Sequence, residues 1–305
     1  MSPVTAGVEA PEIPAIDVAQ RTRAGIGFMV AAAFVFAIQD GLSRHLGGIY
    51  NILMIVMIRY WFFAAFVILV AARRSGIRAA AATRQPVLQA FRGFLLAGEI
   101  CVMVTSFVLL GLVESHSVFA CYPLIVAALS GPVLGEKVGW RRWTAIAIGF
   151  CGILVILQPG VSVIDPVAVV PLIAASMFAL YGLLTRYAAR RDSAATSFFW
   201  TGTAGAVATT AVGMWFWEPM ARADWGWMAL LCCFGVLGHW CLIRAYDLAE
   251  AGAVQPFAYL QLVFAAAVGI GIFGEPLRPA VVVGASIVVG AGLFTLWRAR
   301  KRAAG

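Results

Sequence analysis

Long apolar stretches follow one another along almost the whole chain, and they restrict its fold more than any other feature. A bilayer core about 30 Å thick is crossed by a helix of about 20 apolar residues, and the sequence offers ten such stretches with short connections. They lie at about 24–45, 50–72, 87–111, 115–135, 141–158, 166–188, 195–217, 226–246, 252–274 and 280–298. With 62% hydrophobic residues, 12% charged residues and a mean hydropathy of +0.92, the chain exceeds what a soluble core needs. We therefore predict an all-α membrane protein with ten transmembrane helices.

The two ends of the chain are polar. Residues 1–23 contain three prolines and no basic segment ahead of an apolar one, so they predict a disordered cytoplasmic tail rather than a cleaved signal peptide. Residues 299–305 are expected to form a short basic tail, also in the cytoplasm. The membrane-embedded part is therefore expected between these two tails.

Arg and Lys are concentrated in alternate connections between the apolar stretches. Cytoplasmic loops retain positive charge, and with the N-terminus inside, the inner face collects most of the 22 Arg and Lys residues, Arg84 and Arg92 among them. Arg44, Arg222 and Arg278 are then left outside. We therefore expect both termini in the cytoplasm and the protein in a bacterial inner membrane. The net charge of +8 follows from this topology and implies no nucleic-acid partner.

The chain repeats itself faintly after 142 residues, where AAFVFAIQDGLSRH returns as AASMFALYGLLTRY. Three pairs of segments match: 32–45 with 174–187, 112–114 with 248–250, and 134–153 with 273–292. Because five predicted spans separate the copies, the second copy lies upside down relative to the first, as in many transporters. We predict two inverted five-helix repeats, at 24–158 and 166–298.

Taken together, these features resemble the EamA type of the drug/metabolite transporter superfamily. The resemblance covers nearly all of 24–298 and rests on the ten spans, the two repeats, the Gly-Glu pairs at 135–136 and 274–275, Arg59 in the second span, and the glycine-rich fifth and tenth spans. It implies a central cavity lined mainly by spans 1, 3, 4, 6, 8 and 9, with spans 5 and 10 at the periphery. Members of the family include exporters of amino acids, among them aromatic ones, and carriers of other metabolites in either direction.

Ionisable side chains within the apolar stretches are the first candidates for functional roles, because a charge at membrane depth is costly. Arg59 in the second stretch and Glu99 in the third lie at a similar depth. We expect them to compensate each other directly or through water, and a substrate-binding role for Glu99 is an equal alternative. Asp40 precedes Arg44 by four residues, a spacing that favours an ion pair within one helix.

The repeat alignment adds polar and aromatic candidates. Gln39 is equivalent to Tyr181, so a substrate on the pseudo-symmetry axis could meet both. His239 suits substrate binding or a coupling proton, or alternatively a structural role as a neutral side chain. Trp240 offers a stacking surface, and Tyr259 a polar tip. The substrate-binding candidates are thus Gln39, Glu99, Tyr181, His239, Trp240 and Tyr259, and the candidate structural or coupling charges are Asp40, Arg44 and Arg59.

The motifs expected of other functional classes are missing from the sequence. It contains no HExxH, GxSxG or Asp-rich constellation and no P-loop, so we expect neither an enzyme nor ATP-driven transport, and neither a cofactor nor a metal. We predict a secondary transporter that works by alternating access and exports amino acids, aromatic or neutral. The alternative is an importer of a nucleoside-like or cationic metabolite such as S-adenosylmethionine, for which Glu99 and Asp40 would supply negative charge. A monomer and a homodimer both remain open.

Overall fold

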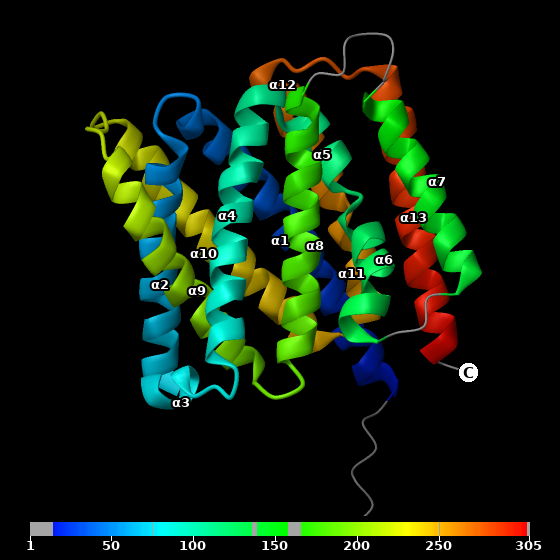
Figure 1. The fold of residues 1–305 in the computed structure, drawn as a ribbon, viewed down its shortest axis with the longest axis horizontal. Helices are drawn as coiled ribbons and strands as arrows, with labels where there is room; N and C mark the ends of the chain where they lie inside the picture. Colours follow the sequence, from blue (N-terminus) through cyan, green and yellow to red (C-terminus); the bar gives the residue numbers. More distant parts are fainter. Residues whose placement is uncertain (1–14, 75, 136–138, 158–165, 250, 304–305) are drawn as a thin grey trace, which may run out of the picture.

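The computed structural model describes residues 15–74, 76–135, 139–157, 166–249 and 251–303. These residues form thirteen α-helices and two 3-10 turns, and within them there is no strand (Figure 1). The elements are α1 (Ala15–Gly47), α2 (Ile52–Arg74), α3 (Ile77–Ala81), α4 (Pro86–Leu110), α5 (Leu112–Phe119), α6 (Tyr122–Leu134), α7 (Trp140–Leu157), η1 (Pro166–Val169), α8 (Val170–Ala188), α9 (Ala194–Gly213), η2 (Met214–Phe216), α10 (Asp224–Leu248), α11 (Ala251–Ala258), α12 (Leu260–Phe273) and α13 (Pro279–Ala303).

Seven helical segments are long and apolar enough to cross a membrane, two of them made of paired helices, 112–134 and 253–273. Shorter apolar segments lie in α7 and α13, and α9 has 20 residues. The chain is therefore an all-helical, multi-pass membrane protein. Of the expected N-terminal tail, residues 1–14 lie outside the described residues, whereas α1 already begins at Ala15. Glu136 and Glu250, members of two of the sequence matches, also lie outside them.

Two of the expected spans are broken rather than continuous. The fourth consists of α5 and α6, and the ninth of α11 and α12. Pro123 lies in the first turn of α6 and Pro256 inside α11, where proline removes a backbone N–H donor and disfavours an uninterrupted helix. Each broken span then ends at a left-handed glycine, Gly135 (φ 76°) or Gly274 (φ 64°). The matching Gly-Glu pairs therefore begin with the same helix-terminating conformation.

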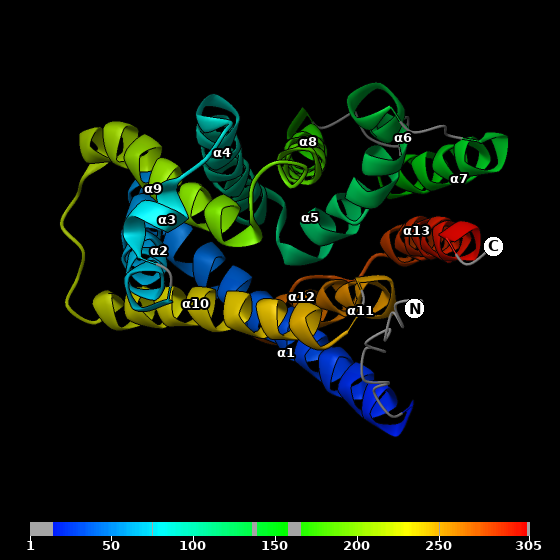
Figure 2. The same ribbon diagram turned by 90° about the horizontal axis from the view of Figure 1, so that it is seen from below.

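Helices of the first half (15–157) find their main partners in the second half (166–303). The helix α1 packs against α10, α2 against α9, α4 against α8 and α9, and α7 against α13. The α7–α13 pair lies at one edge of the molecule, as the family resemblance implied (Figure 2). A Cβ atom added at Gly284 would lie 2.5 Å from the carbonyl oxygen of Gly152. The two halves are therefore interlocked by close backbone packing.

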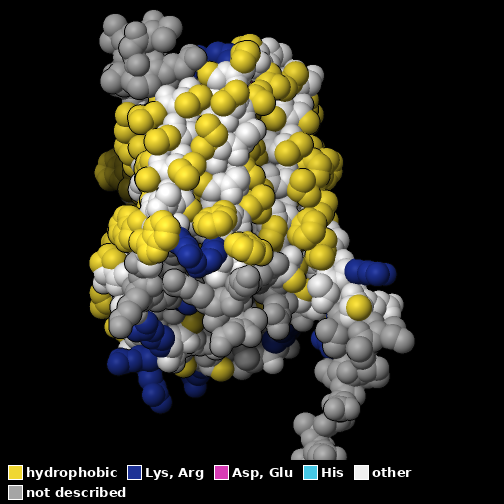
Figure 3. Space-filling model, turned by 90° about the vertical axis from the view of Figure 1, so that its right-hand side faces the viewer, with side chains coloured by type: hydrophobic (Ala, Val, Ile, Leu, Met, Phe, Trp, Pro, Cys, Tyr) yellow, Lys and Arg dark blue, Asp and Glu magenta, His cyan; other side chains and the backbone are white. Residues whose placement is uncertain are grey.

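The surface also divides by chemistry. Figure 3 shows hydrophobic side chains over most of one face and Lys and Arg gathered mainly toward its lower end. We name the lower end, with the α8–α9 turn, the Asp192 end, and the upper end, with the α12–α13 connection, the Glu275 end (Figure 1). Large aromatic side chains such as Trp140, Trp215 and Trp297 are exposed, as in the interfacial belts of membrane proteins.

Candidate functional site

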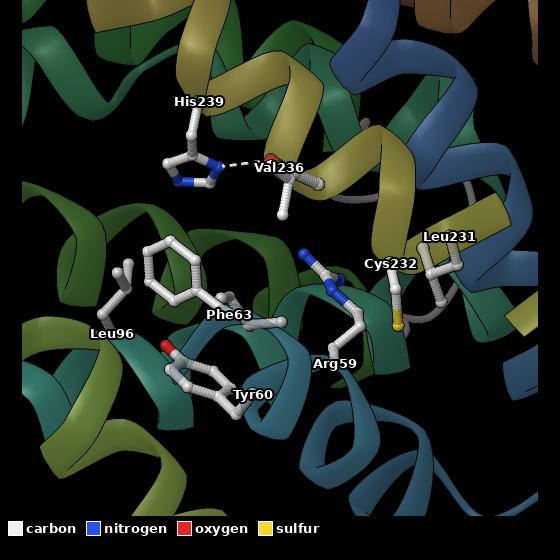
Figure 4. A pocket seen from close by; sticks show the side chains of 10 residues that line it. Arg59, Tyr60, Phe63, Leu96, Leu231, Cys232, Val236 and His239 are labelled. Atoms are coloured by element: carbon white, nitrogen blue, oxygen red, sulfur yellow. Dashed lines mark hydrogen bonds between the residues drawn. The ribbon is translucent and has the colours of Figure 1, made fainter. Parts of the chain in front are cut away.

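A small cavity of about 40 Å³ lies between α2, α4 and α10. At about 10–15 Å³ for each water, it has room for about three water molecules. Two of its side chains carry strongly polar groups, Arg59 and His239, and both point into it in Figure 4. The remaining lining is largely apolar or aromatic: Tyr60, Phe63, Leu96, Ile100, Leu231, Cys232, Gly235 and Val236.

His239 is surrounded by aromatic rings from three other helices. Its ring centroid lies 5.3 Å from Phe36, 5.1 Å from Phe63 and 6.1 Å from Phe198, and its Nδ1 lies 2.8 Å from the Gly235 carbonyl oxygen. We call this group the His239 cage. Gly238 makes the close approach of Phe36 possible, because a Cβ atom there would lie 2.5 Å from that ring. The cage therefore unites α1 and α2 of one half with α9 and α10 of the other.

The two predicted mid-membrane charges lie near this cavity but do not touch. Arg59 donates from Nη1 to the Ser43 hydroxyl at 3.3 Å, and within the described chain it forms no ion pair with Glu99. Glu99 is buried, lies on α4 between the lining residues Leu96 and Ile100, and is within electrostatic range of Arg59 and Asp40. Of the two expected arrangements, the direct contact between these two described residues is not formed, and compensation through water stays a prediction.

Asp40 contacts residues from two other helices. Its Oδ2 lies 3.1 Å from Nε2 of His116 on α5 and accepts a hydrogen bond of 3.0 Å from Nε2 of Gln261 on α12. The expected pair with Arg44 is replaced, because Arg44 is engaged elsewhere. The sequence interpretation missed His116, although the criterion that selected Asp40, an ionisable side chain in an apolar stretch, applies to it equally.

The partner of Arg44 is Glu275, just after the end of α12. Besides this ion pair, the Glu275 carboxylate accepts hydrogen bonds of 2.8 Å from the backbone N–H groups of Leu112 and Val113. These are the free donors at the N-terminus of α5, where a carboxylate is also favoured by the helix dipole. Gly111 starts this turn with φ +85°. Glu275 thus joins α1, α5 and α12 at one end of the bundle, and we call this group the Glu275 junction.

Four further candidates are not among the residues that line the cavity. Gln39 is buried against Gly235, and its Oε1 has no hydrogen-bond partner in the described structure. The Tyr181 hydroxyl lies 3.4 Å from the Thr201 hydroxyl, and within the described part of the chain no hydrogen bond joins Tyr181 to Gln39. Trp240 is 46% exposed, and its ring packs at 84° to that of Phe28; its stacking role stays a prediction.

Tyr259 likewise lies elsewhere. It stands at the break between α11 and α12, where its buried hydroxyl meets Gly292 of α13. A Cβ atom at Gly292 would lie only 1.9 Å from that oxygen. Tyr259 therefore packs against Gly292 of α13 and against a core cluster that includes Cys121 and Leu124 of the first half.

Arg92, which the charge pattern assigns to the inner face, lies within α4. It is fully buried in α4, and its Nε and Nη2 donate to the Thr185 hydroxyl on α8 at 3.1 and 2.7 Å. Its Nη1 donates to Gln89, which in turn donates to Asp192 at 2.8 Å. At Asp192, burial raises the pKa, but hydrogen bonds from Thr83, Gln89 and the Arg84 N–H outweigh it and lower the pKa below its usual value. This network fastens the Asp192 end.

Known proteins include relatives that match most of this chain. The S-adenosylmethionine uptake transporter of Rickettsia prowazekii (strain Madrid E) is 26% identical over 280 residues, which are 91% of this chain and 94% of that protein. The riboflavin transporter of Vibrio cholerae is 26% identical over 285 residues, with the same two coverages, 91% and 94%. A solved crystal structure shares the fold, with a TM-score of 0.60 at 16% identity, covering 93% of this chain and 98% of the other.

The family comparison is broader still. The model of the EamA-like transporter family matches residues 23–158 and again residues 166–297, so the two matched units coincide with the two halves that interlock in the structure. The chain therefore belongs to the EamA-like transporter family and is a membrane transporter of small molecules, not an enzyme.

Proposed function

We propose that this protein is a secondary transporter that takes up a nucleoside-like metabolite, one with a planar fused heteroaromatic ring and a hydroxylated chain. S-adenosylmethionine and riboflavin, named for the two relatives, both have this chemistry. Import of such a compound was the alternative interpretation of the sequence. The first interpretation, amino-acid export, finds no support in these relatives.

The observation that carries the proposal is the His239 cage beside a buried carboxylate. Aromatic rings offer a heteroaromatic ligand stacking and edge contacts. In the same cavity Arg59 supplies a hydrogen-bond donor, and His239, whose Nδ1–H faces the Gly235 carbonyl, supplies an acceptor at Nε2. Glu99 lies one turn from Leu96 of the lining, and its carboxylate form would place negative charge there. A carboxylate beside aromatic faces suits a cationic sulfonium, so S-adenosylmethionine is the first candidate and riboflavin the second.

Transport in this proposal occurs by alternating access of ten spans arranged as two inverted repeats. The Asp192 end, rich in Arg, is cytoplasmic with both termini, and the Glu275 end faces outward, in line with the positive-inside rule. A ligand of this size needs a cavity of roughly 300 Å³ or more, against the 40 Å³ present here. The halves must therefore separate around the cage during the cycle, while the Glu275 junction closes the outer end.

Counterflow in proteoliposomes tests the substrate class. Vesicles loaded with unlabelled S-adenosylmethionine, riboflavin, adenosine, phenylalanine or tryptophan receive the same labelled compound outside, without ATP. We expect transient accumulation of S-adenosylmethionine, riboflavin or both, and competition by adenosine. Accumulation of phenylalanine or tryptophan that no heteroaromatic compound inhibits would contradict the proposal and restore amino-acid transport.

Two variants then locate the site. Phe63→Ala removes a ring of the cage, whereas Phe62→Ala removes an exposed ring from the adjacent position of α2. We expect only Phe63→Ala to lower counterflow, by about ten-fold or more, because a well-placed aromatic contact and its burial contribute about 1.5–3 kcal/mol. Glu99→Gln should reduce transport of the cation S-adenosylmethionine far more than that of neutral riboflavin. Equal losses for both compounds would rule out a charge-recognition role for Glu99.

A further inference from the structure

We propose that Asp40 and His116 form a proton-binding site, through which this transporter is coupled to protons. The inference rests on the proposed secondary transport, and goes beyond it by naming a second ligand and its residues. Asp40 comes from α1 and His116 from α5, so the two groups are far apart in the chain and are brought together only by the fold.

The geometry of the pair is that of a buried acid facing a buried base. The Oδ2 and Nε2 atoms lie 3.1 Å apart, and the two side chains are 13% and 6% exposed. The imidazole ring is held by stacking on Phe107, at 5.1 Å between centroids and 22° between planes. Nevertheless its Nε2 is not aligned for a hydrogen bond to any described residue. A ring nitrogen that is buried, held in place and uncommitted, 3.1 Å from a carboxylate oxygen, is suited to accept a proton.

The charges around the Asp40–His116 pair determine the net charge that a bound proton would change. The carboxylates of Asp40 and Glu99 interact with each other, and Arg59 of α2 is the cation within range of Glu99. Arg44 on α1 is already neutralised by Glu275. Residues 251–258 of α11 and 260–273 of α12 contain no ionisable side chain, and their polar side chains are Gln255 and Gln261. Titratable or charged groups on other neighbouring helices include Cys101 of α4, Tyr181 of α8 and His239 of α10.

With Asp40 and Glu99 both ionised and the histidines neutral, this central group would hold two negative charges against the one positive charge of Arg59. A proton from water that adds to the lone pair of His116 Nε2 creates an imidazolium beside the Asp40 carboxylate and brings the group to neutrality. Uncompensated charge is unfavourable at membrane depth, so the proton is bound where it removes the imbalance. A cationic substrate near Glu99 removes the same imbalance, so proton and cation replace each other, whereas a neutral substrate is accompanied by the proton.

The pair is also well placed to respond to opening. Asp40 lies one turn from Arg44, and His116 one turn from Leu112, on the two helices that Glu275 joins. Gln261 of α12, the helix that ends just before Glu275, donates to Asp40. Separation of these helices at the Glu275 end would therefore expose the pair to water on that side. The proton would then enter from the side that is open and leave when the other side opens.

Histidine NMR tests proton binding without any substrate. The chain has three histidines, so protein labelled with ¹⁵N-histidine in lipid gives three sets of ring signals, and His116→Gln assigns one of them. We expect the His116 signals to report binding of a proton, and Asp40→Asn to change that response while the signals of exposed His45 stay as in the wild type. If His116→Gln does not assemble, His45→Gln and His239→Gln assign the signal by elimination. A His116 signal that does not titrate, or whose midpoint ignores Asp40→Asn, overturns the proposal.

Transport under a pH gradient tests coupling. In wild-type proteoliposomes an acidic exterior should raise riboflavin uptake several-fold and lower S-adenosylmethionine uptake, relative to equal pH. For each compound, we compare the uptake rate with an acidic exterior to the rate at equal pH. In Asp40→Asn and His116→Gln the ratio of these two rates should be about one, and in His45→Gln it should stay at the wild-type value. A wild type that ignores the gradient, or variants that keep its effect, would overturn the coupling while leaving the substrate proposal intact. Absence of all heteroaromatic counterflow would instead defeat the substrate proposal, and the NMR titration would still decide proton binding.

Discussion

Arg44 on α1 is ion-paired with Glu275, which lies 231 positions further along the chain. The guanidinium also lies over the Phe273 ring, at 4.1 Å from its centroid. Through Glu275 it is linked to the first backbone N–H groups of α5. One carboxylate thus neutralises a cation and accepts hydrogen bonds from a helix terminus at a tight turn. Its loss should therefore weaken the contacts among three helices.

The first prediction concerns that carboxylate. Glu275→Gln should lower the free energy of unfolding by about 1.5–3 kcal/mol, the range for hydrogen bonds to a buried charged group. Glu114→Gln is the matched control at the same end, because its ion pair with Arg278 is much more exposed, and exposed pairs contribute about 0–1 kcal/mol. Thermal unfolding in detergent compares the two variants. Equal losses would show that the Glu275 junction contributes no more than a surface ion pair.

The second prediction concerns the packing of the His239 cage. Gly238→Ala places a methyl group 2.5 Å from the Phe36 ring, and overpacking of this kind costs about 1–3 kcal/mol. We expect counterflow to fall by roughly five- to a hundred-fold. Gly226→Ala, on the same helix with open space around it, should keep transport within about two-fold and favour the helix slightly. Similar transport by both variants would argue against a role for Phe36.

The third prediction is a pH dependence at the Asp192 end. The hydrogen bonds lower the folded-state pKa of Asp192, so its stabilisation is complete above the unfolded pKa of about 3.9 and disappears as the pH falls through the folded value. Asp192→Asn should therefore unfold at a lower temperature than wild type near pH 7, and the difference should shrink below about pH 4. Melting curves at several pH values would detect this. A difference that stays constant with pH would show that the network does not favour the ionised carboxylate.

Much of the helix layout could be predicted from the sequence because residues of helices that cross lipid are predominantly apolar. The expected span at 87–111 is α4 (Pro86–Leu110), and the one at 141–158 is α7 (Trp140–Leu157). An average of hydropathy over a window of residues does not detect a break inside a span. The interruptions before Tyr122 and at Tyr259 depend on local proline and turn geometry, and only the two prolines hinted at them.

The candidate site was predicted less well, and the reasons are specific. The cost of a charge at membrane depth selects Arg59 and Glu99, and the repeat alignment selects His239. Arg59 and His239 line the cavity, and Glu99 lies on α4 between two lining residues. Trp240 and Tyr259 were selected by type and position, which do not reveal the face of the helix that meets lipid or a neighbour. Arg44 was assigned to Asp40 because a spacing of four residues suggests contact, whereas the real partner depends on how α12 ends.

The interlocked packing of the two halves has a consequence for how the molecule is assembled. The helices α1, α2 and α7 all have major partners in the other half, so a polypeptide of residues 1–158 or 159–305 made alone lacks the surfaces that it needs and should be degraded. Co-expression of the two pieces should restore a transporting complex, detected by co-purification through a tag on one piece and by counterflow. In such a protein, covalent continuity between the halves is dispensable, and equal stoichiometry is not.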